Sequence, residues 1–518
     1  MKRFTFNVVM TLGLSLWLCA ISLNVAYAGD ITVCPPGAGI CDYNTIQDAI
    51  DAAVTGDTIK VATGTYTDVH GRSTTFDYRT TITQVVYISK SLAIRGGYTT
   101  ENWTTPDPKT NLTILDAEDR GRVIYIVGDI SPTLEGLHIT GGNTAGLGES
   151  LWENNVGGGA YVLTATVALI GCEITDNSAM YGGGLYLRDS HNPVLRGNAM
   201  YSNTAEFEGG GIYLFNSDNA ILSNNTISNN AAWGKYFPRF IFGGFGGGIC
   251  LRDSDHVMLG RNFVLSNTVR FGGGGGVCLI DSDYATLYGN TILSNTIDGE
   301  WWGDAYGSAY GGGVYIAYSD SAMLTSNAVR NNKTRGWDEG YGGGIALCGN
   351  ANAVLNNNVI ADNSTSTQGS GIYVLASTAH LLHTTIARNT GGDDSGIYVT
   401  DYSTLAMTNT ILVSHTVGLI VAADDAATLN GVLWYGNDVN TGGLGNITVT
   451  HQITGNPAFD ADGYHITPHS MAIDAGVAAG IAVDIDGEPR PPGDGSDLGA
   501  DEWVTWTYIY LPLVTRET

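Results

Sequence analysis

The sequence predicts an all-β protein, a single-stranded right-handed parallel β-helix or solenoid with a short N-terminal helical cap and a small C-terminal β region, and three observations support the solenoid. One sequence phrase recurs between Gly157 and Ile372: a glycine run, an aliphatic–aromatic–aliphatic triplet, a Ser/Asp turn and two asparagines. The asparagines fall 14 and 19 residues after the last glycine in six successive copies. Glycine accounts for 71 of 518 residues and charged residues for only 14%, as expected of a turn-rich solenoid. So strict a repeat indicates one unit stacked many times, and crossovers between parallel strands are right-handed.

The first 28 residues are predicted to be a secretory signal peptide. Lys2 and Arg3 precede an apolar run over 8–23, and Ala26-Tyr27-Ala28 is a small-residue cleavage site. No later apolar stretch is long enough to span a bilayer. We therefore expect a secreted or cell-surface protein without a transmembrane span after cleavage.

Residues 29–56 are expected to cap the N-terminal end of the solenoid. The segment 44–53 has apolar residues at helical spacing, and Asn44 with Gln47 could form a capping box. Such a helix would cover the edge strands of the first coil. Cys34 and Cys41 bracket a short Pro/Gly loop, which predicts a disulfide in an exported protein.

The solenoid itself is predicted over residues 57–450, with its first strands at 56–61, 92–95, 123–126 and 134–139. In Leu185-Tyr186-Leu187 the leucines should point into the coil and Tyr186 outward, because side chains alternate along a strand. A second inward column is expected at Leu195, Leu222, Leu259, Leu287, Leu324, Leu355 and Leu382. The outward slot of the triplet holds Tyr161, Tyr186, Tyr213, Cys250, Cys278, Tyr315, Ala346, Tyr373 and Tyr398.

Two columns of turn residues follow from the same register. The asparagines are predicted to form side-chain ladders at tight turns, where Asn tolerates a left-handed conformation. A second column is acidic, at Asp218, Asp255, Asp283 and Asp320. Hydrogen bonds within the turns are the favoured interpretation of this acidic column, and weak Ca²⁺ binding is the sharper hypothesis. No other cofactor is expected.

The remaining cysteines leave one alternative open. Cys250 and Cys278 occupy the same slot in consecutive copies, where stacked strands would place their Cα atoms ~4.8 Å apart. That spacing allows a disulfide, whereas two free thiols in an apolar column are the competing interpretation. Cys172 and Cys348 are expected to be unpaired.

Net charge excludes some partners. The chain carries a formal charge of −27 and an isoelectric point near 4.4. Nucleic-acid binding requires clustered Lys and Arg, so neither nucleic acid nor an anionic membrane surface is an expected partner.

Three insertions interrupt the regular spacing, at 231–245, 296–310 and 333–341. Because the register is fixed, all three should emerge at one edge of the solenoid, where repeat proteins often bind their partners. Their aromatic residues are the ligand-binding candidates: Trp233, Tyr236, Trp301, Trp302, Tyr306, Trp337 and Tyr341. Exposed aromatic rings stack on sugar faces, which favours a polysaccharide or cell-surface glycan as partner and leaves a protein partner possible. The alternative is that these rings pack the loops onto the outward tyrosines.

Catalysis is the second function class. The insertions offer carboxylates and cations as catalytic candidates: Glu300, Asp304, Asp338, Glu339, Lys235 and Arg239. Arg188 and Arg252 add two cations on the regular coils. A glycoside hydrolase needs two carboxylates ~5 to 9.5 Å apart, and these residues match no catalytic signature. Non-catalytic binding is therefore the favoured function, and a polysaccharide lyase or glycoside hydrolase is the alternative.

Two parts of the chain resemble known families. Residues 43–53 with Gly56-Asp57-Thr58-Ile59 resemble the opening of secreted bacterial β-helix proteins with the pectin-lyase-like fold. Residues 451–503 are similar to the choice-of-anchor Q domain, in the motifs Asn456-Pro457-Ala458-Phe459, Ala472-Ile473-Asp474-Ala475-Gly476, Asp484-Ile485-Asp486-Gly487, Arg490-Pro491 and Asp497-Leu498-Gly499-Ala500-Asp501-Glu502. The apolar tail 504–518 resembles the ends of some surface-displayed bacterial proteins. The resemblance implies fold and export but not activity, because this fold hosts lyases, hydrolases, adhesins and inert fibres.

Overall fold

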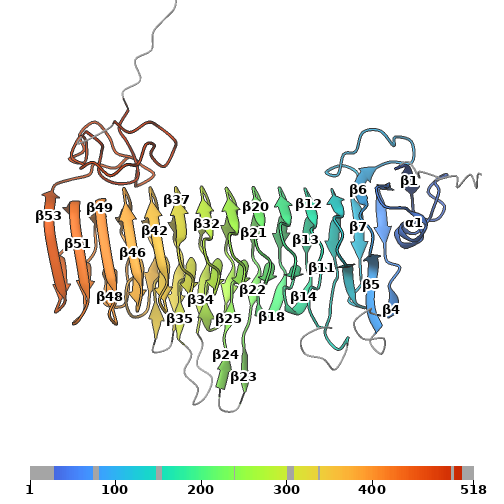
Figure 1. The fold of residues 1–518 in the computed structure, drawn as a ribbon, viewed down its shortest axis with the longest axis horizontal. Helices are drawn as coiled ribbons and strands as arrows, with labels where there is room; N and C mark the ends of the chain where they lie inside the picture. Colours follow the sequence, from blue (N-terminus) through green and yellow to red (C-terminus); the bar gives the residue numbers. More distant parts are fainter. Residues whose placement is uncertain are drawn as a thin grey trace, which may run out of the picture.

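The computed structural model describes residues 28–73, 81–147, 155–237, 240–299, 308–336, 339–491 and 495–504. These residues form a long solenoid of stacked parallel strands, with one short helix at its N-terminal end (Figure 1). The strands belong to sheets of 26, 14 and 11 strands and one two-stranded hairpin. The predicted parallel β-helix is thereby confirmed. Within these ranges no helix has the length and hydropathy needed to cross a membrane.

Most coils contribute two short strands to sheet 1, and the two strands of a coil meet at a corner. At one corner Gly171, with φ of 58°, separates β12 from β13. The predicted strand 134–139 is likewise two strands, β9 and β10. The strands of sheet 1 are β1 (Asp30–Val33), β2 (Thr58–Ala62), β3 (Gly64–Tyr66), β6 (Ala93–Tyr98), β7 (Thr113–Asp116), β9 (Thr133–Glu135), β10 (His138–Thr140), β12 (Ala168–Ile170), β13 (Glu173–Thr175), β16 (Val194–Arg196), β17 (Ala199–Tyr201), β20 (Ile221–Ser223), β21 (Thr226–Ser228), β27 (Met258–Gly260), β28 (Phe263–Leu265), β32 (Thr286–Tyr288), β33 (Thr291–Leu293), β37 (Ala322–Thr325), β38 (Ala328–Arg330), β42 (Asn352–Asn356), β43 (Val359–Ala361), β46 (Thr378–Leu382), β47 (Thr385–Ala387), β49 (Thr404–Val413), β51 (Ala426–Tyr435) and β53 (Asn446–Thr454).

Sheet 2 contains the aliphatic–aromatic–aliphatic triplets. Its strands are β4 (His70–Ser73), β5 (Thr81–Ile88), β8 (Arg122–Val127), β11 (Ala160–Leu163), β15 (Leu185–Arg188), β19 (Ile212–Phe215), β26 (Ile249–Arg252), β31 (Val277–Ile280), β36 (Val314–Ala317), β41 (Ile345–Cys348), β45 (Ile372–Leu375), β48 (Ser395–Thr400), β50 (Val417–Val421) and β52 (Val439–Gly443). Leu185 and Leu187 are fully buried in the core of the coil. Tyr186 and Tyr213 lie outside that core, as predicted, but are only 6% and 4% exposed, because they belong to a second buried cluster.

Sheet 3 lies at the edge where the insertions leave and re-enter the coils. Its strands are β14 (Ser178–Tyr181), β18 (Thr204–Glu208), β22 (Ala231–Ala232), β25 (Gly244–Phe245), β29 (Thr268–Val269), β30 (Gly272–Gly273), β34 (Thr296–Asp298), β35 (Ala309–Tyr310), β39 (Lys333–Arg335), β40 (Gly340–Tyr341) and β44 (Ser364–Thr365). The hairpin of β23 (Lys235–Phe237) and β24 (Phe240–Phe242) projects from this edge (Figure 1). The expectation of a single insertion edge is confirmed.

The asparagine ladders are present and buried. Asn230, for example, donates its side-chain amide to Asn267 Oδ1 at 3.0 Å and to the Met200 carbonyl at 2.9 Å. The prediction of a left-handed backbone at these asparagines is wrong, because the residue before each ladder position takes it, as Asn229 does with φ of 54°. The inward column also needs one correction. Leu381 pairs with Leu355 in place of Leu382, because the turn between β45 and β46 is one residue shorter.

The N-terminal end is covered by α1 (Ile46–Ala52). Its N-cap is Thr45, whose hydroxyl accepts the Asp48 N–H, so the predicted capping role of Asn44 is wrong. Asn44 instead donates to the Cys34 carbonyl. The Cys34–Cys41 disulfide is formed, with 6.1 Å between the Cα atoms. Ile46, Ala49 and Ile50 belong to the main core, so the helix covers the first coil as expected.

The other four described cysteines are free and buried, at Cys172, Cys250, Cys278 and Cys348. The strands of Cys250 and Cys278 are paired with these residues directly opposite each other. The disulfide interpretation of this pair is therefore wrong, and the two thiols lie in the second buried cluster.

The C-terminal segment, residues 455–491 and 495–504, packs on the outer side of sheet 1 (Figure 1). Ile466, Ala472 and Leu498 pack against solenoid residues that include Ile411 and Leu433. The expected small C-terminal β region is present in the described residues of this segment only as isolated bridges, Phe459 with Ile466 and Val483 with Pro489. Arg490 and Glu502 form a buried ion pair, 2.7 Å long and at most 4% exposed.

Candidate functional site: a cleft over the tyrosine column

The outward slots of sheet 2 hold a column of aromatic rings from Tyr125 to Tyr213. Tyr161 and Tyr186 stack with centroids 5.2 Å apart and planes 7° apart, and Tyr186 stacks on Tyr213 at 5.0 Å and 13°. This stacking follows from the register, because equivalent residues of successive coils lie directly above one another. The column is the floor of a cleft on the outside of the solenoid.

One wall of the cleft comes from sheet 3. The residues just before each glycine run rise beside the tyrosine floor, and Tyr181 of β14 stacks on Tyr213 at 5.7 Å. Floor and wall enclose a cavity of ≈ 470 Å³. Its lining residues are Tyr181, Tyr186, Arg188, Glu208, Tyr213, Phe215 and Arg252. We call this cavity the tyrosine cleft.

Charged groups stand at the rim of the tyrosine cleft. Arg252 holds Glu208 in a bidentate pair, with Nε–Oε2 at 3.0 Å and Nη2–Oε1 at 2.6 Å. Burial alone would lower the pKa of Arg252, but Glu208 more than offsets this and raises that pKa. Arg188 lies directly opposite Phe215 of the next coil, and its Nε is 3.4 Å from Asp189 Oδ2. The cleft therefore combines aromatic surface with a few fixed polar groups.

The tyrosines of the cleft stay neutral at ordinary pH. Burial raises the pKa of Tyr186 and of Tyr213. Burial, followed by the nearby Glu208, raises the pKa of Tyr181 to about 12. These residues can stack and form hydrogen bonds, but they offer no phenolate for proton transfer at neutral pH.

A smaller hollow lies next to the first insertion. Its volume is ≈ 260 Å³, and Trp233 and Glu206 are among its lining residues. Trp233 is 40% exposed, and the guanidinium of Arg270 lies 5.1 Å from its ring. Lys235 forms an ion pair with Glu206. Trp233 thus presents an accessible aromatic face, as predicted.

The sequence of this solenoid matches a family profile described as the right-handed β-helix region, over residues 129–292 and 247–439. These two matches together cover more than half of the chain. The chain belongs to the right-handed β-helix family. No curated protein matches the chain in sequence.

Solved structures of three polysaccharide-acting proteins are similar to this chain at low sequence identity. Pectate lyase Pel9A is 12% identical, with 92% of this chain and 97% of that chain covered and a TM-score of 0.33. The A-module of the Azotobacter vinelandii mannuronan C-5 epimerase AlgE6 is 13% identical, with 79% and 93% covered and a TM-score of 0.38. The catalytic domain of a GH87 α-1,3-glucanase is 12% identical, with 81% and 67% covered and a TM-score of 0.31. At such identities the likeness concerns the fold alone.

Several predicted site residues lie outside the described part of this β-helix protein. They are Arg239, Glu300, Trp301, Trp302, Asp304, Tyr306, Trp337 and Asp338. Tyr236 lies in β23, but its side chain is also outside the described part. The roles given to these residues stay predictions.

Two other predicted residues make packing contacts. Tyr341 stacks on Tyr373 at 4.7 Å and on Tyr310 at 5.3 Å, so its ring helps to cover the tyrosine column. The Glu339 carboxylate accepts a hydrogen bond from the Ser308 hydroxyl. The contacts of Tyr341 therefore support the interpretation in which this ring packs onto the outward tyrosines.

The acidic column forms hydrogen bonds between coils. Asp218 Oδ1 accepts the Asp255 N–H at 2.8 Å, Asp255 Oδ1 accepts the Asp283 N–H at 2.8 Å, and Asp283 Oδ1 accepts the Asp320 N–H at 2.7 Å. The neighbouring serines form a parallel ladder, in which the Ser217 N–H donates to Ser254 Oγ at 3.0 Å. The acidic column thus forms hydrogen bonds at the turns, as the favoured interpretation expects. The Ca²⁺ role stays a prediction.

Sequence reasoning named Arg188 and Arg252 as cations but did not place them in one cleft. It missed Tyr181, Glu208 and Phe215. A usable signal exists, because Tyr181 and Glu208 each stand directly before a glycine run. In a fixed register that position faces the tyrosine column.

Proposed function

We propose that this protein is a secreted or cell-surface β-helix protein that binds glycans in the tyrosine cleft. The observation that carries the proposal is the ≈ 470 Å³ cavity, with an aromatic floor and an arginine–carboxylate rim. Its volume lies in the range of about 300–1,000 Å³ that is usual for small-molecule sites. The aromatic insertions at the same edge would extend the contact surface along the axis.

The chemistry of the lining suits a hydroxyl-rich ligand. The half-buried rings of Tyr181 and Phe215 offer apolar faces to the C–H side of a sugar ring. The bidentate Arg252–Glu208 pair keeps its donors and acceptors in fixed geometry, which orients hydroxyl groups. Arg188 adds a second guanidinium, so a carboxylated sugar is also a suitable ligand.

Binding without catalysis is favoured because three described carboxylates of this edge are already engaged. Glu208 is held by Arg252, Glu206 by Lys235, and Glu339 by Ser308. Hydrolysis of a glycoside needs one carboxylic acid and one free carboxylate on opposite sides of the bond. A polysaccharide lyase or glycoside hydrolase is the alternative function, and Glu300, Asp304 and Asp338 are its candidate carboxylates in the insertions.

Export of the protein is part of the proposal. The Cys34–Cys41 disulfide supports it, since such bonds persist mainly in oxidising compartments. The proposed division is a signal peptide over 1–28, a cap over 29–56, the solenoid over 57–450, a choice-of-anchor Q-like region over 451–503 and a tail over 504–518. A surface protein partner is an alternative to a glycan, because tyrosine, tryptophan and arginine also dominate protein interfaces.

The test is calorimetric titration of the mature protein with neutral and uronate-containing oligosaccharides. We expect Phe215→Ala and Arg188→Gln each to weaken binding by at least tenfold (about 1.4 kcal/mol). Arg196→Gln is the matched control, because Arg196 is exposed on sheet 1. If Phe215→Ala and Arg188→Gln bind as tightly as the wild type, the cleft is not the binding site.

The catalytic alternative has a separate readout. Incubation with the same glycans would release new reducing ends if the protein is a hydrolase, or unsaturated uronates if it is a lyase. Full glycan binding with neither product supports the binding function. Turnover that is lost in Glu300→Gln, Asp304→Asn or Asp338→Asn would replace it.

A further inference from the structure

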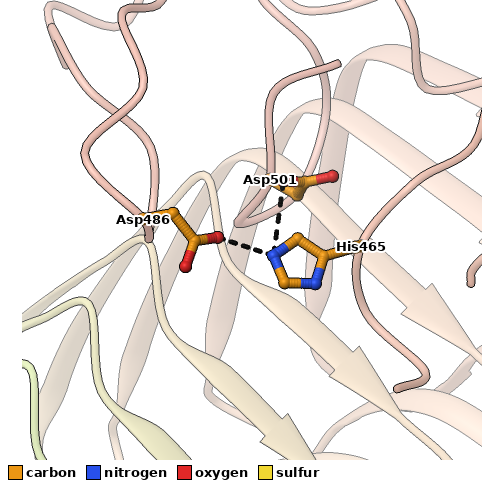
Figure 2. A group of neighbouring side chains, drawn as sticks. All are labelled: His465, Asp486 and Asp501. Carbon is orange, nitrogen blue, oxygen red and sulfur yellow. Dashed lines mark hydrogen bonds and ion pairs between the residues drawn. The ribbon is translucent and has the colours of Figure 1, made fainter. Parts of the chain in front are cut away.

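A compact group of metal-ligating side chains lies in the C-terminal segment. His465 Nε2 is 2.6 Å from Asp486 Oδ2 and 3.9 Å from Asp501 Oδ1. The three ligand-type atoms all lie within 4.8 Å of one another. Figure 2 shows both carboxylates on the same side of the imidazole ring. Among the described residues, His465, Asp486 and Asp501 are the group of three or more His, Cys, Asp or Glu side chains whose ligand atoms lie this close together.

Hydrogen bonds with neighbouring residues orient His465 and Asp486. The Nδ1 side of His465 is hydrogen-bonded to Asp462 Oδ2, while Asp462 Oδ1 accepts the His465 N–H at 3.1 Å. Asp486 is positioned by its own N–H, which donates to Asp484 Oδ1 at 3.0 Å. A carboxylate behind a histidine fixes the ring and leaves the opposite nitrogen for a ligand, as in carboxylate–histidine–metal arrangements.

Asp501 contributes the more buried of the two carboxylates in the group. Its side chain is only 7% exposed, and its Oδ2 accepts the Ile466 N–H at 2.7 Å. Its Oδ1 faces His465 at 3.9 Å, which is beyond hydrogen-bond distance, and no described residue donates to it. Asp501 therefore places a largely buried carboxylate beside the same ring nitrogen that Asp486 contacts.

The ligand set identifies the class of ion. Ligands bound about 2.0–2.2 Å from a tetrahedral Zn²⁺ lie roughly 3–4 Å from one another. The 3.9 Å separation from His465 Nε2 to Asp501 lies within that spacing, and the 2.6 Å separation to Asp486 is shorter, so the Asp486 carboxylate would have to rotate away from the ring nitrogen. Ca²⁺ and Mg²⁺ prefer ligand sets made of oxygen, whereas an imidazole nitrogen with two carboxylates suits Zn²⁺ and its first-row neighbours.

We propose that His465, Asp486 and Asp501 form a site for one divalent transition-metal ion, with Zn²⁺ as its representative. The three ligands come from three separate turns of a segment that has little regular secondary structure of its own. An ion shared by these turns would fasten the C-terminal segment into one conformation against sheet 1. The free energy of metal binding would then add to the folding stability of this segment.

The first experiment measures stoichiometry and stability. The mature protein is treated with a chelator, dialysed, and titrated with Zn²⁺, Mn²⁺ and Ca²⁺ in a calorimeter. We expect one Zn²⁺ to bind per chain, more tightly than Ca²⁺, and to raise the melting temperature. A chain that binds no Zn²⁺ at micromolar concentration, or that binds Ca²⁺ in preference, overturns the proposal.

Variants locate the ion. His465→Gln and Asp486→Asn should abolish the Zn²⁺ response, and Asp462→Asn should weaken affinity by about 10–100-fold, as expected for a group behind a ligand. Glu488→Gln is the control, because Glu488 lies two residues from Asp486 and its carboxylate makes no hydrogen bond or ion pair with the described residues. If His465→Gln fails to fold, Asp486→Asn decides, since the Asp486 side chain is 48% exposed and tolerates replacement.

The competing interpretation is an imidazolium ion held between carboxylates. Burial lowers the pKa of His465, but Asp462 and Asp486 more than offset this and raise it to about 9. If the ion pairs of a protonated His465 with Asp462 and Asp486 explain the cluster, the chelator leaves the melting temperature unchanged. The Asp486→Asn variant then also binds Zn²⁺ as the wild type does. Either result overturns the metal site.

Discussion

The three glycines at 182–184 and at 209–211 meet two different requirements. The first has a left-handed backbone, with φ of 60° at Gly182 and 66° at Gly209. The second and third have no space for a side chain, because a Cβ on Gly210 would lie 2.4 Å from the Gly247 carbonyl oxygen and 2.6 Å from that of Ala231. A side chain at the second or third glycine would therefore collide with the backbone of the next coil.

Replacement of Gly210 by alanine tests this close approach. We expect Gly210→Ala to lower the free energy of unfolding by more than about 2 kcal/mol, because backbone atoms of two coils must move apart. Gly197→Ala is the matched control, since Gly197 has φ of 66° but no atom lies within 4 Å of the position that a methyl group would take there. The loss of unfolding free energy in Gly197→Ala should stay near the roughly 1–2 kcal/mol that an alanine in the left-handed conformation costs. Equal losses in urea denaturation would show that packing at Gly210 is not limiting.

His415 occupies one position of an asparagine ladder. The Asn389 amide donates to His415 Nε2 at 3.3 Å, and the His415 N–H donates to Asn437 Oδ1 at 3.0 Å. Burial is the main reason that the pKa of His415 falls from 6.5 to about 4, and burial likewise lowers that of His383 to about 3. The folded chain thus holds both rings neutral, and protonated Nε2 could no longer accept from Asn389.

These two histidines contribute to the pH dependence of stability, and Asp501 and Glu502, whose pKa values burial raises to about 6 and about 7, contribute in the opposite direction. Between pH 6.5 and about 4 the unfolded chain binds a proton on His415 and the folded chain does not. Protonation therefore favours unfolding, and the free energy of unfolding should fall by up to about 1.4 kcal/mol per pH unit for each histidine as the pH decreases. His415→Asn should remove one of these two contributions and extend the ladder. His380→Asn, at an exposed position of β46, should leave the slope of the denaturation midpoint against pH unchanged.

At the scale of elements, the hairpin of β23 and β24 is an addition to a coil that closes without it. β22 pairs with β29 and β25 pairs with β30, and only two residues join β29 to β30. Residues 233–243 occupy the same interval in the coil with the hairpin. The fold therefore does not require the hairpin, which projects beyond the solenoid at the insertion edge (Figure 1).

Deletion of this hairpin should leave the solenoid folded. In the variant, residues 233–243 are replaced by Arg-Phe, the link of the next coil. We expect the free energy of unfolding to change by no more than about 1 kcal/mol, because loop closure depends weakly on length. Circular dichroism and the melting temperature check the fold, and glycan titration checks whether the Trp233 side of the edge contributes affinity. Loss of the solenoid would contradict the additive role of the hairpin.

Local patterns predicted the repeated elements better than the site. Alternation within Leu185-Tyr186-Leu187 fixed the inward and outward faces, because one coil determines the next. The N-cap was misplaced by one residue, since Asn44 and Thr45 are both good caps and only tertiary contacts decide between them. The cleft could not be predicted in the same way. Its Arg252–Glu208 pair joins residues 44 apart in sequence through the register of two sheets.

At the scale of the whole molecule, the two ends of the solenoid differ in what covers them. The N-terminal end lies under α1, whose Ile46 and Ile50 are 3% and 2% exposed. At the other end β53 pairs with β51 and with no second strand in the described part of the chain, and most of its residues are exposed. Figure 1 shows the C-terminal segment beside the solenoid and not across this end. Coils in a solenoid contact only their neighbours, so β53 has half the support of a central strand.

Hydrogen exchange should therefore show a gradient along the axis. Amide protons of β53 should exchange at least about tenfold faster than those of β26 and β31, which have paired strands on both sides. The N-terminal β2 should be protected, because β1 and α1 lie against it. Mass spectrometry of pepsin fragments measures all three regions in one experiment, and the central coils serve as the internal control. Protection of β53 equal to that of the central coils would mean that another part of the chain, or a second molecule, covers this edge in solution, since an open terminal strand frays first.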